Sequence, residues 1–358
     1  PYTDEIRDAT VLELVAERGL GVYLDDPADT EGLTDEQRHR IHWSQRLHPP
    51  GHYVLGSLLR GGHGLLEGWR YLYAVPWLVA LAIALGLARR TRTRTMVLGV
   101  VALVFAATYL RNYTLIRMGN ELNPFLGMTG FLATLAWAAR SGGWRPASLA
   151  LAFLCVVLAV FAKFSALVSM LAVLGALGVV LLVRRDRTSL VLLGGSAGIL
   201  VAAVLLYGFL FRGTHMLDLQ TEGYGARVLR TLRLVSDEAA KEMASGQRVG
   251  GRPMSYFLLR APFQFGPVVL LTFGYAAWCV LARRVAVRPT DLFLLVFVAL
   301  NLAGVLLVNP RVQYTAPMMG AVAFFAVSVL SRRFPPGDTV RIAAIAVLFA
   351  AAEVFLML

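Results

Sequence analysis

Residues 146–183 read PASLALAFLCVVLAVFAKFSALVSMLAVLGALGVVLLV. This stretch contains two apolar runs, 146–162 and 164–183, and its single charged residue, Lys163, stands at their junction. A run of roughly 18 or more residues with few charges is long enough to cross the hydrocarbon core of a bilayer. Because a charge at a lipid-facing midpoint is costly, we expect a tight hairpin that places Lys163 at the membrane interface. The stretch predicts a polytopic integral membrane protein.

The composition of the whole chain agrees with this prediction. Of its 358 residues 57% are hydrophobic and only 16% are charged, with a mean hydropathy of +0.64. Soluble domains average about 25% charged residues. The net charge is +12, but the arginines form short clusters between apolar runs and no single basic face, so nucleic acid is not an expected partner. Cys155 and Cys279 lie inside apolar runs, which is typical of small buried hydrophobes rather than of a disulfide or a metal pair.

The apolar runs predict an all-α fold, a bundle of about ten membrane spans in the region 66–358. The expected spans are 67–89, 94–112, 121–139, 146–162, 164–183, 188–211, 262–282, 290–308, 313–331 and 340–358.

Every second connection between these spans is short and basic. Arginines near a span end mark the cytoplasmic side, so the acidic first segment, the loop at about 212–261 and the turn at 309–313 should share the opposite side. The clustered arginines are Arg89, Arg90, Arg92, Arg94, Arg140, Arg145, Arg184, Arg185, Arg187, Arg283, Arg284, Arg288, Arg332 and Arg333.

Residues 1–65 are predicted to form a first extracytoplasmic loop with short surface helices. Between Asp4 and Glu36 lie 11 of the 22 acidic residues. One helix is expected from Thr3 to about Glu17, and Thr34 with Gln37 has the capping-box pattern of a second that ends before Pro49. Asp25, Asp26 and Pro27 predict the turn between them, and a third short helix is expected from Pro50 to about Gly61. Because the chain opens at Pro1 without a methionine, we expect a further helix upstream.

Three groups of polar residues suggest chemistry on the side opposite the arginine clusters. Asp4 and Glu5 could supply a general base, although acids also favour the first turn of a helix for electrostatic reasons. His48, before Pro49 and Pro50, could contact a phosphate or an acceptor, or could simply belong to a helix-entry turn. Single residues of these kinds are more often structural than functional.

Cations on that side form the third group. Lys163, Arg212 and Arg311 could bind phosphate, since arginine offers a planar fork to phosphate oxygens and lysine a point charge. The alternative is that each side chain extends to the lipid headgroups. The sequence contains no phosphate-binding G-x-x-x-x-G-K-[ST] loop, no H-E-x-x-H or paired C-x-x-C for zinc, and no clear inverted repeat of broken helices.

The order of these motifs resembles the GT-C membrane glycosyltransferases, and most of all glycosyltransferase family 39, the protein mannosyltransferase and aminoarabinose transferase-like group. Residues 113–125, which include Asn-Glu-Leu-Asn-Pro, depart from the pattern expected there. The matching residues are Asp4-Glu5, His48-Pro49-Pro50, Arg70 in Gly-Trp-Arg-Tyr-Leu, Ala162-Lys163-Phe164-Ser165-Ala166-Leu167, and Arg311-Val312-Gln313-Tyr314.

The resemblance implies an enzyme of the bacterial inner membrane that transfers a sugar from a polyprenyl-phosphate donor to a lipid, glycan or protein acceptor outside the cytoplasm. Asp4 and Glu5 would then be catalytic, and Lys163, Arg212 and Arg311 would bind the donor phosphate. We expect His48, Arg70, Arg260 and Tyr314 to bind the substrates. A divalent metal is compatible with this chemistry, but no residue pattern supports one.

Two other functions use the same residues. A transporter or flippase for a lipid-linked or anionic solute would need polar residues near the middle of several spans, where the sequence offers mainly Asn301 and Glu353. A non-catalytic membrane partner would not bring Asp4, Glu5 and Lys163 together. The position of these residues in the fold separates the three possibilities.

Overall fold

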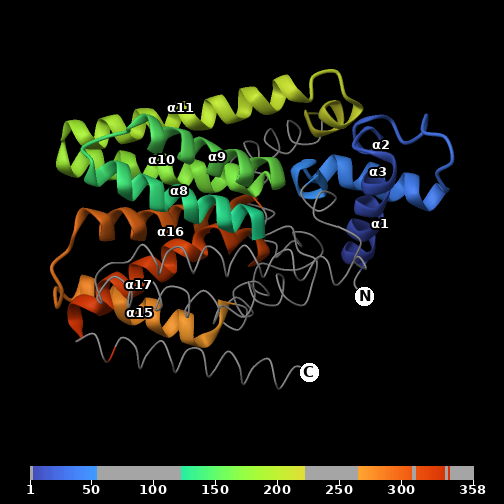
Figure 1. Ribbon diagram of the computed structural model, residues 1–358. Helices are drawn as coiled ribbons and strands as arrows, with labels where there is room; N and C mark the ends of the chain where they lie inside the picture. The colour runs from blue at the N-terminus through green and yellow to red at the C-terminus, as the bar shows by residue number, and fades with distance from the viewer. Residues whose placement is uncertain (1–2, 55–121, 222–264, 309–311, 335–337, 339–358) are drawn as a thin grey trace, which may run out of the picture.

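The computed structural model describes residues 3–54, 122–221, 265–308, 312–334 and 338, and this part of the chain is helical, with no strand. A compact group of N-terminal helices lies at one end of a bundle of long helices (Figure 1). The expected spans 67–89, 94–112 and 340–358 lie outside the described residues.

The N-terminal group consists of α1 (Thr3–Arg18), α2 (Gly21–Leu24) and α3 (Asp35–Leu47). The capping box expected at Thr34 is present, since Gln37 N–H donates to Thr34 Oγ1 and Thr34 N–H donates to Gln37 Oε1. The first expected helix is also confirmed, whereas the single turn of α2 was not predicted. Of the third expected helix, residues 51–54 are helical and the remainder lies outside the described part.

The bundle helices run alternately towards and away from the N-terminal group (Figure 1). Their bounds agree with the expected spans to within one or two residues, with two exceptions. Helix α15 begins after Gly266, whose φ of 90° interrupts a helix, and the expected span 313–331 divides into a 3₁₀ segment that contains Pro317 and an α-helix. The elements are α8 (Leu122–Arg140), α9 (Pro146–Ala162), α10 (Ser165–Arg184), α11 (Arg187–Leu210), α15 (Pro267–Leu281), α16 (Pro289–Val308), η2 (Val312–Met318) and α17 (Met319–Arg333).

Four helical stretches in the described residues are long and apolar enough to cross a membrane. They are Ser165–Arg184, Arg187–Leu210, Pro289–Leu306 and Thr315–Arg333. The 17-residue α9 is also apolar but shorter. Leu182, Leu205 and Phe209 remain at least 67% exposed on α10 and α11, as expected of side chains that face lipid. These features support a membrane protein.

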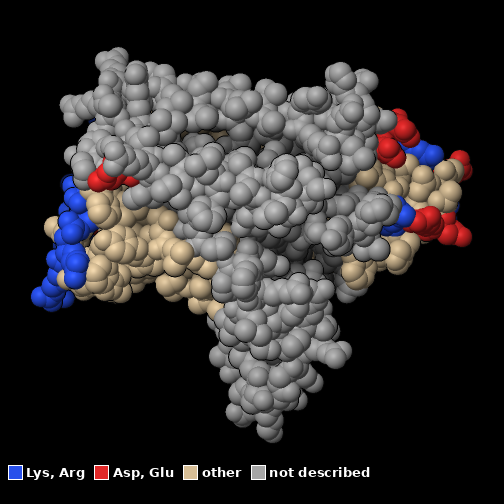
Figure 2. Space-filling model, turned by 90° about the horizontal axis from the view of Figure 1, so that it is seen from below, with Lys and Arg blue, Asp and Glu red and all other residues tan. Residues whose placement is uncertain are grey.

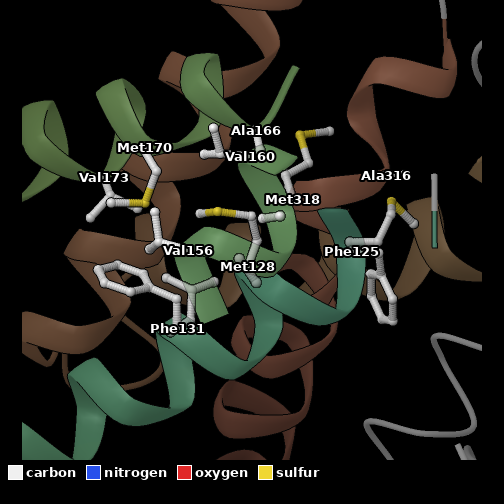
Figure 3. Close-up of a cluster of buried hydrophobic side chains, with 14 of the residues drawn as sticks. Phe125, Met128, Phe131, Val156, Val160, Ala166, Met170, Val173, Ala316 and Met318 are labelled. Atoms are coloured by element: carbon white, nitrogen blue, oxygen red, sulfur yellow. The ribbon is translucent and has the colours of Figure 1, made fainter. Parts of the chain in front are cut away.

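Glycines allow α8 to approach its neighbours closely. A Cβ on Gly127 would lie 2.5 Å from the carbonyl oxygen of Cys155, and one on Gly130 would lie 2.8 Å from Cys155 Sγ. Small residues of this kind are how membrane helices pack without a hydrophobic driving force from water. Around this contact lies a buried core of Phe125, Met128, Phe131, Val156, Val160, Ala166, Met170, Val173, Ala316 and Met318 (Figure 3).

A buried polar pair joins α10 to α16. Asn301 Nδ2 donates to Ser169 Oγ over 2.6 Å, and both side chains are at most 1% exposed. The two helices approach each other closely here, because a Cβ on Gly175 would meet Leu300 and one on Gly304 would meet Val168. The pair therefore links two helices inside the bundle.

The arginine end is the end of the bundle where α8, α10, α15 and α17 finish and where α9, α11 and α16 begin. Its arginines form a basic surface in the space-filling view, opposite the mixed acidic and basic surface of the N-terminal helices (Figure 2). The described arginines of this end are Arg140, Arg145, Arg184, Arg185, Arg187, Arg283, Arg284, Arg288, Arg332 and Arg333. The predicted alternation of basic connections is thus confirmed where the chain is described.

One ion pair at the arginine end is almost fully buried. Arg332 Nη2 lies 2.7 Å from Asp291 Oδ1, with side-chain exposures of 9% and 0%. Arg332 also donates to the carbonyl of Ala286, and Asp291 Oδ2 accepts the backbone N–H of Arg288. The pair thereby holds the start of α16 against the end of α17.

Candidate functional site

The Lys163 end, which is the end of the bundle opposite the arginine end, carries the N-terminal helices. Gln220 provides the direct link, because its Nε2 donates to the backbone carbonyls of Gln45 at 2.8 Å and His48 at 2.9 Å. Tyr207, near the end of α11, donates its hydroxyl to Gln220 Oε1 over 2.6 Å. Gln220 is 2% exposed, so these hydrogen bonds are shielded from solvent. The N-terminal group is therefore held on the bundle by hydrogen bonds from the side-chain amide of Gln220.

The backbone of His48 is held from two directions. Its carbonyl accepts from Tyr23 Oη at 2.8 Å as well as from Gln220, and its N–H donates to Ser44 at the end of α3. Gln45 Nε2 fixes the α2 side of the same junction by donating to the carbonyls of Tyr23 and Asp25. The half-buried imidazole of His48 is thus carried on a rigid turn.

The turn formed by His48, Pro49, Pro50 and Gly51 packs directly on the end of α9. A Cβ on Gly51 would lie 2.7 Å from the carbonyl oxygen of Phe161, so only glycine allows this approach. Pro49 and Pro50 are buried, and the rings of the following His52 and Tyr53 are fully buried. Through Gly51, the His-Pro-Pro turn therefore contacts Phe161, which stands two residues before Lys163. More than a hundred residues separate the turn from Lys163 in the chain.

Lys163 closes α9 and is only 4% exposed. Its N–H donates to Ala159, and its carbonyl accepts from Ala166 in the first turn of α10, which confirms the tight hairpin expected from the sequence. The flanking rings of Phe161 and Phe164 both pack edge-on against Tyr207. Because Lys163 is buried within the protein, the alternative that its side chain extends to the lipid headgroups does not fit this residue.

Arg212 and His215 also lie at the Lys163 end. Arg212 follows α11 and is exposed, so the structure does not bring its guanidinium into the buried cluster. His215 Nδ1 lies 3.8 Å from Asp26 Oδ2, and its ring is 6.2 Å from that of His42. These three residues form a second, more exposed contact between the N-terminal group and the bundle.

The remaining predicted site residues are only partly placed. Asp4 and Glu5 occupy the first turn of α1, at the same end of the molecule as Lys163, but their side chains lie outside the described residues. The same holds for the side chain of Tyr314 in η2. Arg70, Arg260 and Arg311 lie outside the described residues altogether. The predicted grouping of Asp4 with Lys163 remains a prediction.

Gln220 and Tyr207 were not identified from the sequence. Tyr207 has the signature of an interfacial aromatic residue near the end of an apolar run, which is a usable signal. The sequence contains no comparable signal for Gln220, because its partners Gln45 and His48 lie 175 and 172 residues away in the chain. Among the side chains that the structure describes, no group of three metal-ligating residues is present.

Searches with protein-family models, against curated proteins and against solved structures find no match to this chain.

Proposed function

We propose that this protein is a membrane glycosyltransferase of the GT-C type, which moves a sugar from a polyprenyl-phosphate donor to an acceptor outside the cytoplasm. The observation that carries the proposal is the burial of Lys163 at the end of α9, directly beneath the docked His-Pro-Pro turn. A buried cation in a membrane protein is a functional-site hypothesis by default. In this proposal Lys163 binds the anionic phosphate of a lipid-linked donor as a point charge.

The donor would keep its isoprenoid tail in the bilayer and its phosphate near Lys163. An acceptor hydroxyl or amine attacks the anomeric carbon, the bond from that carbon to the phosphate oxygen breaks, and polyprenyl phosphate leaves. Asp4 takes the acceptor proton and Glu5 positions the acceptor. Lys163, with Arg311, stabilises the charge that develops on the phosphate. Attack from the side opposite the leaving group inverts the anomeric configuration.

His48 supplies positioning in this scheme. Its backbone is fixed by Tyr23 and Gln220, so its half-buried imidazole is presented from a turn that cannot shift without disturbing α9. Preorganised positioning of two substrates can supply a large part of a rate enhancement. We therefore assign the docked N-terminal group a direct part in binding the acceptor or the phosphate.

A transporter is less well supported by the described spans. Its pathway would need polar groups near the membrane midplane that can exchange partners with a solute. Asn301 Nδ2 is bonded to Ser169 Oγ between two closely packed helices, while Asn301 Oδ1 has no hydrogen-bond partner in the structure as described. Such a pair fits a structural link between α10 and α16.

Replacement of Asp4 by Asn tests the enzyme proposal. Purified protein in lipid nanodiscs would be given synthetic polyprenyl-phosphate sugars, and release of polyprenyl phosphate would be measured by mass spectrometry. We expect turnover by the native chain and a loss of about 10²-fold or more in the Asp4→Asn variant, the usual range for general-base removal. Asp29→Asn, at an exposed acid of the same N-terminal group, should keep full turnover. Undiminished turnover in Asp4→Asn would remove Asp4 from the mechanism.

A further inference from the structure

Asn123 is a buried polar residue that the proposed mechanism does not use. It lies in the first turn of α8 and is 6% exposed, and its Nδ2 has no hydrogen-bond partner in the structure as described. An unpaired buried amide donor lowers the stability of a protein, so its presence calls for an explanation. The residue belongs to the stretch 113–125, which departs from the family pattern, so the resemblance assigns it no role.

Helix geometry places Asn123 at the level of Lys163. Gly127 of α8 faces Cys155 and Ala159 of α9 at close range. Residues four apart share one face of a helix, so Asn123 lies on this same face, one turn nearer the Lys163 end. Lys163 is likewise four residues beyond Ala159 along the antiparallel α9. The two residues are therefore at the same level of the α8–α9 pair.

The chemistry around Asn123 favours a negatively charged oxygen as its missing partner. The N-termini of both α8 and α10 point to the Lys163 end, and α10 has no side-chain cap on its first N–H groups. Helix N-termini attract anions, and Lys163 is a basic residue at the same level. An amide donor in such surroundings is best satisfied by an oxygen that only accepts hydrogen bonds, as those of a phosphate do.

We infer that Asn123 donates a hydrogen bond to a phosphate oxygen of the polyprenyl-phosphate donor, next to the charge of Lys163. The inference rests on the proposed function and adds to it a neutral donor that aligns the phosphate. Lysine is a point charge with no fixed direction, whereas the amide of a buried asparagine donates along a defined line. Asn123 is thus a residue that sets the orientation of the leaving phosphate.

Binding of undecaprenyl phosphate, which carries no sugar, provides the test. The full chain in nanodiscs would be titrated with this lipid, with the bound fraction read by native mass spectrometry. Asn123→Leu should weaken binding by about tenfold or more, through the loss of one hydrogen bond to a charged group. Without the lipid, the same variant should keep or raise its thermal midpoint, because the unpaired donor is gone. A residue of purely structural importance would give the opposite pattern.

Asn123→Asp is the second variant, since it preserves the shape of the side chain and places a carboxylate against the phosphate. It should bind still less lipid than Asn123→Leu. Asn301→Leu removes another buried amide, one already bonded to Ser169 between α10 and α16, and should bind as the native chain does. If the native chain itself binds no undecaprenyl phosphate, the proposed function and this inference both fail. If it binds and both Asn123 variants bind equally well, only the role of Asn123 is refuted.

Discussion

Substitution of Gly51 by alanine would test whether the His-Pro-Pro turn must lie against the end of α9. The backbone of Gly51 has no left-handed conformation, so alanine introduces no backbone strain, and the effect is one of space alone. The new Cβ would lie 2.7 Å from the Phe161 carbonyl oxygen, and ordinary contact begins at 3.4 Å. The turn must therefore move by about 0.7 Å, the difference between these two distances.

The size of the effect follows from that displacement. Forcing one extra carbon into a packed contact costs about 1–3 kcal/mol of stability. A shift of about 1 Å in a positioning element can cost about 10²-fold in rate, so a displacement somewhat smaller should reduce turnover by at least about tenfold. We expect Gly51→Ala to lower both the thermal midpoint and the rate of sugar transfer, the rate more severely.

The matched control is Gly178→Ala in α10, where a Cβ would meet nothing within 4 Å. That variant should keep native turnover and gain slightly in stability, since alanine is the better helix former by about 0.5–1 kcal/mol. The reasoning is refuted if Gly51→Ala is as active and as stable as the native chain. A loss of stability with full activity would show that the turn contributes to packing and not to catalysis.

Three further results are expected. Arg332→Met should destabilise the fold by about 3–5 kcal/mol in chemical denaturation, because it leaves the Asp291 charge buried and unpaired. Adding Asp291→Leu should restore most of the lost stability. A double variant no more stable than Arg332→Met would contradict this. The pair of Asn301 and Ser169 should show a coupling energy of about 0.6 kcal/mol, and at most about 1.7, in a double-mutant cycle, and zero coupling would show that the hydrogen bond is not formed. Hydrogen bonds from Ser189 hold the pKa of Asp186 below its usual value, so the stability it contributes is present above the usual carboxyl pKa and is lost as pH falls through the depressed one. Asp186→Asn should therefore flatten the acid limb of the stability profile, and an unchanged limb would refute the assignment.

Much of the bundle could be predicted because its elements are specified locally. The runs that became α9, α10 and α11 are apolar for the length of a span, and polar residues or proline mark their ends. The capping box of α3 is likewise a pattern of four neighbouring residues. The departures at α15 and η2 arise where Gly266 and Pro317 change the backbone inside an apolar run, and apolarity alone does not reveal that.

The candidate site was less predictable because its contacts join distant segments. The sequence indicated that Lys163 stands at a hairpin, but its burial depends on neighbours from other helices. Gln220 lies in a segment that reads as a loop, and its role became clear only from its bonds to α3. Asn123 reads as an ordinary helix-start residue in the sequence, and its burial and unpaired amide nitrogen are visible only in the structure.

The most direct test of the account is the lipid that the protein carries when it is extracted from native membranes. Native mass spectrometry of the full chain should detect a bound polyprenyl phosphate, with or without a sugar, and Lys163→Met should lose it while keeping its fold. The presence of the same lipid in equal amount in both proteins, or its absence from the native chain, would contradict the claim that the buried end of α9 is a phosphate site.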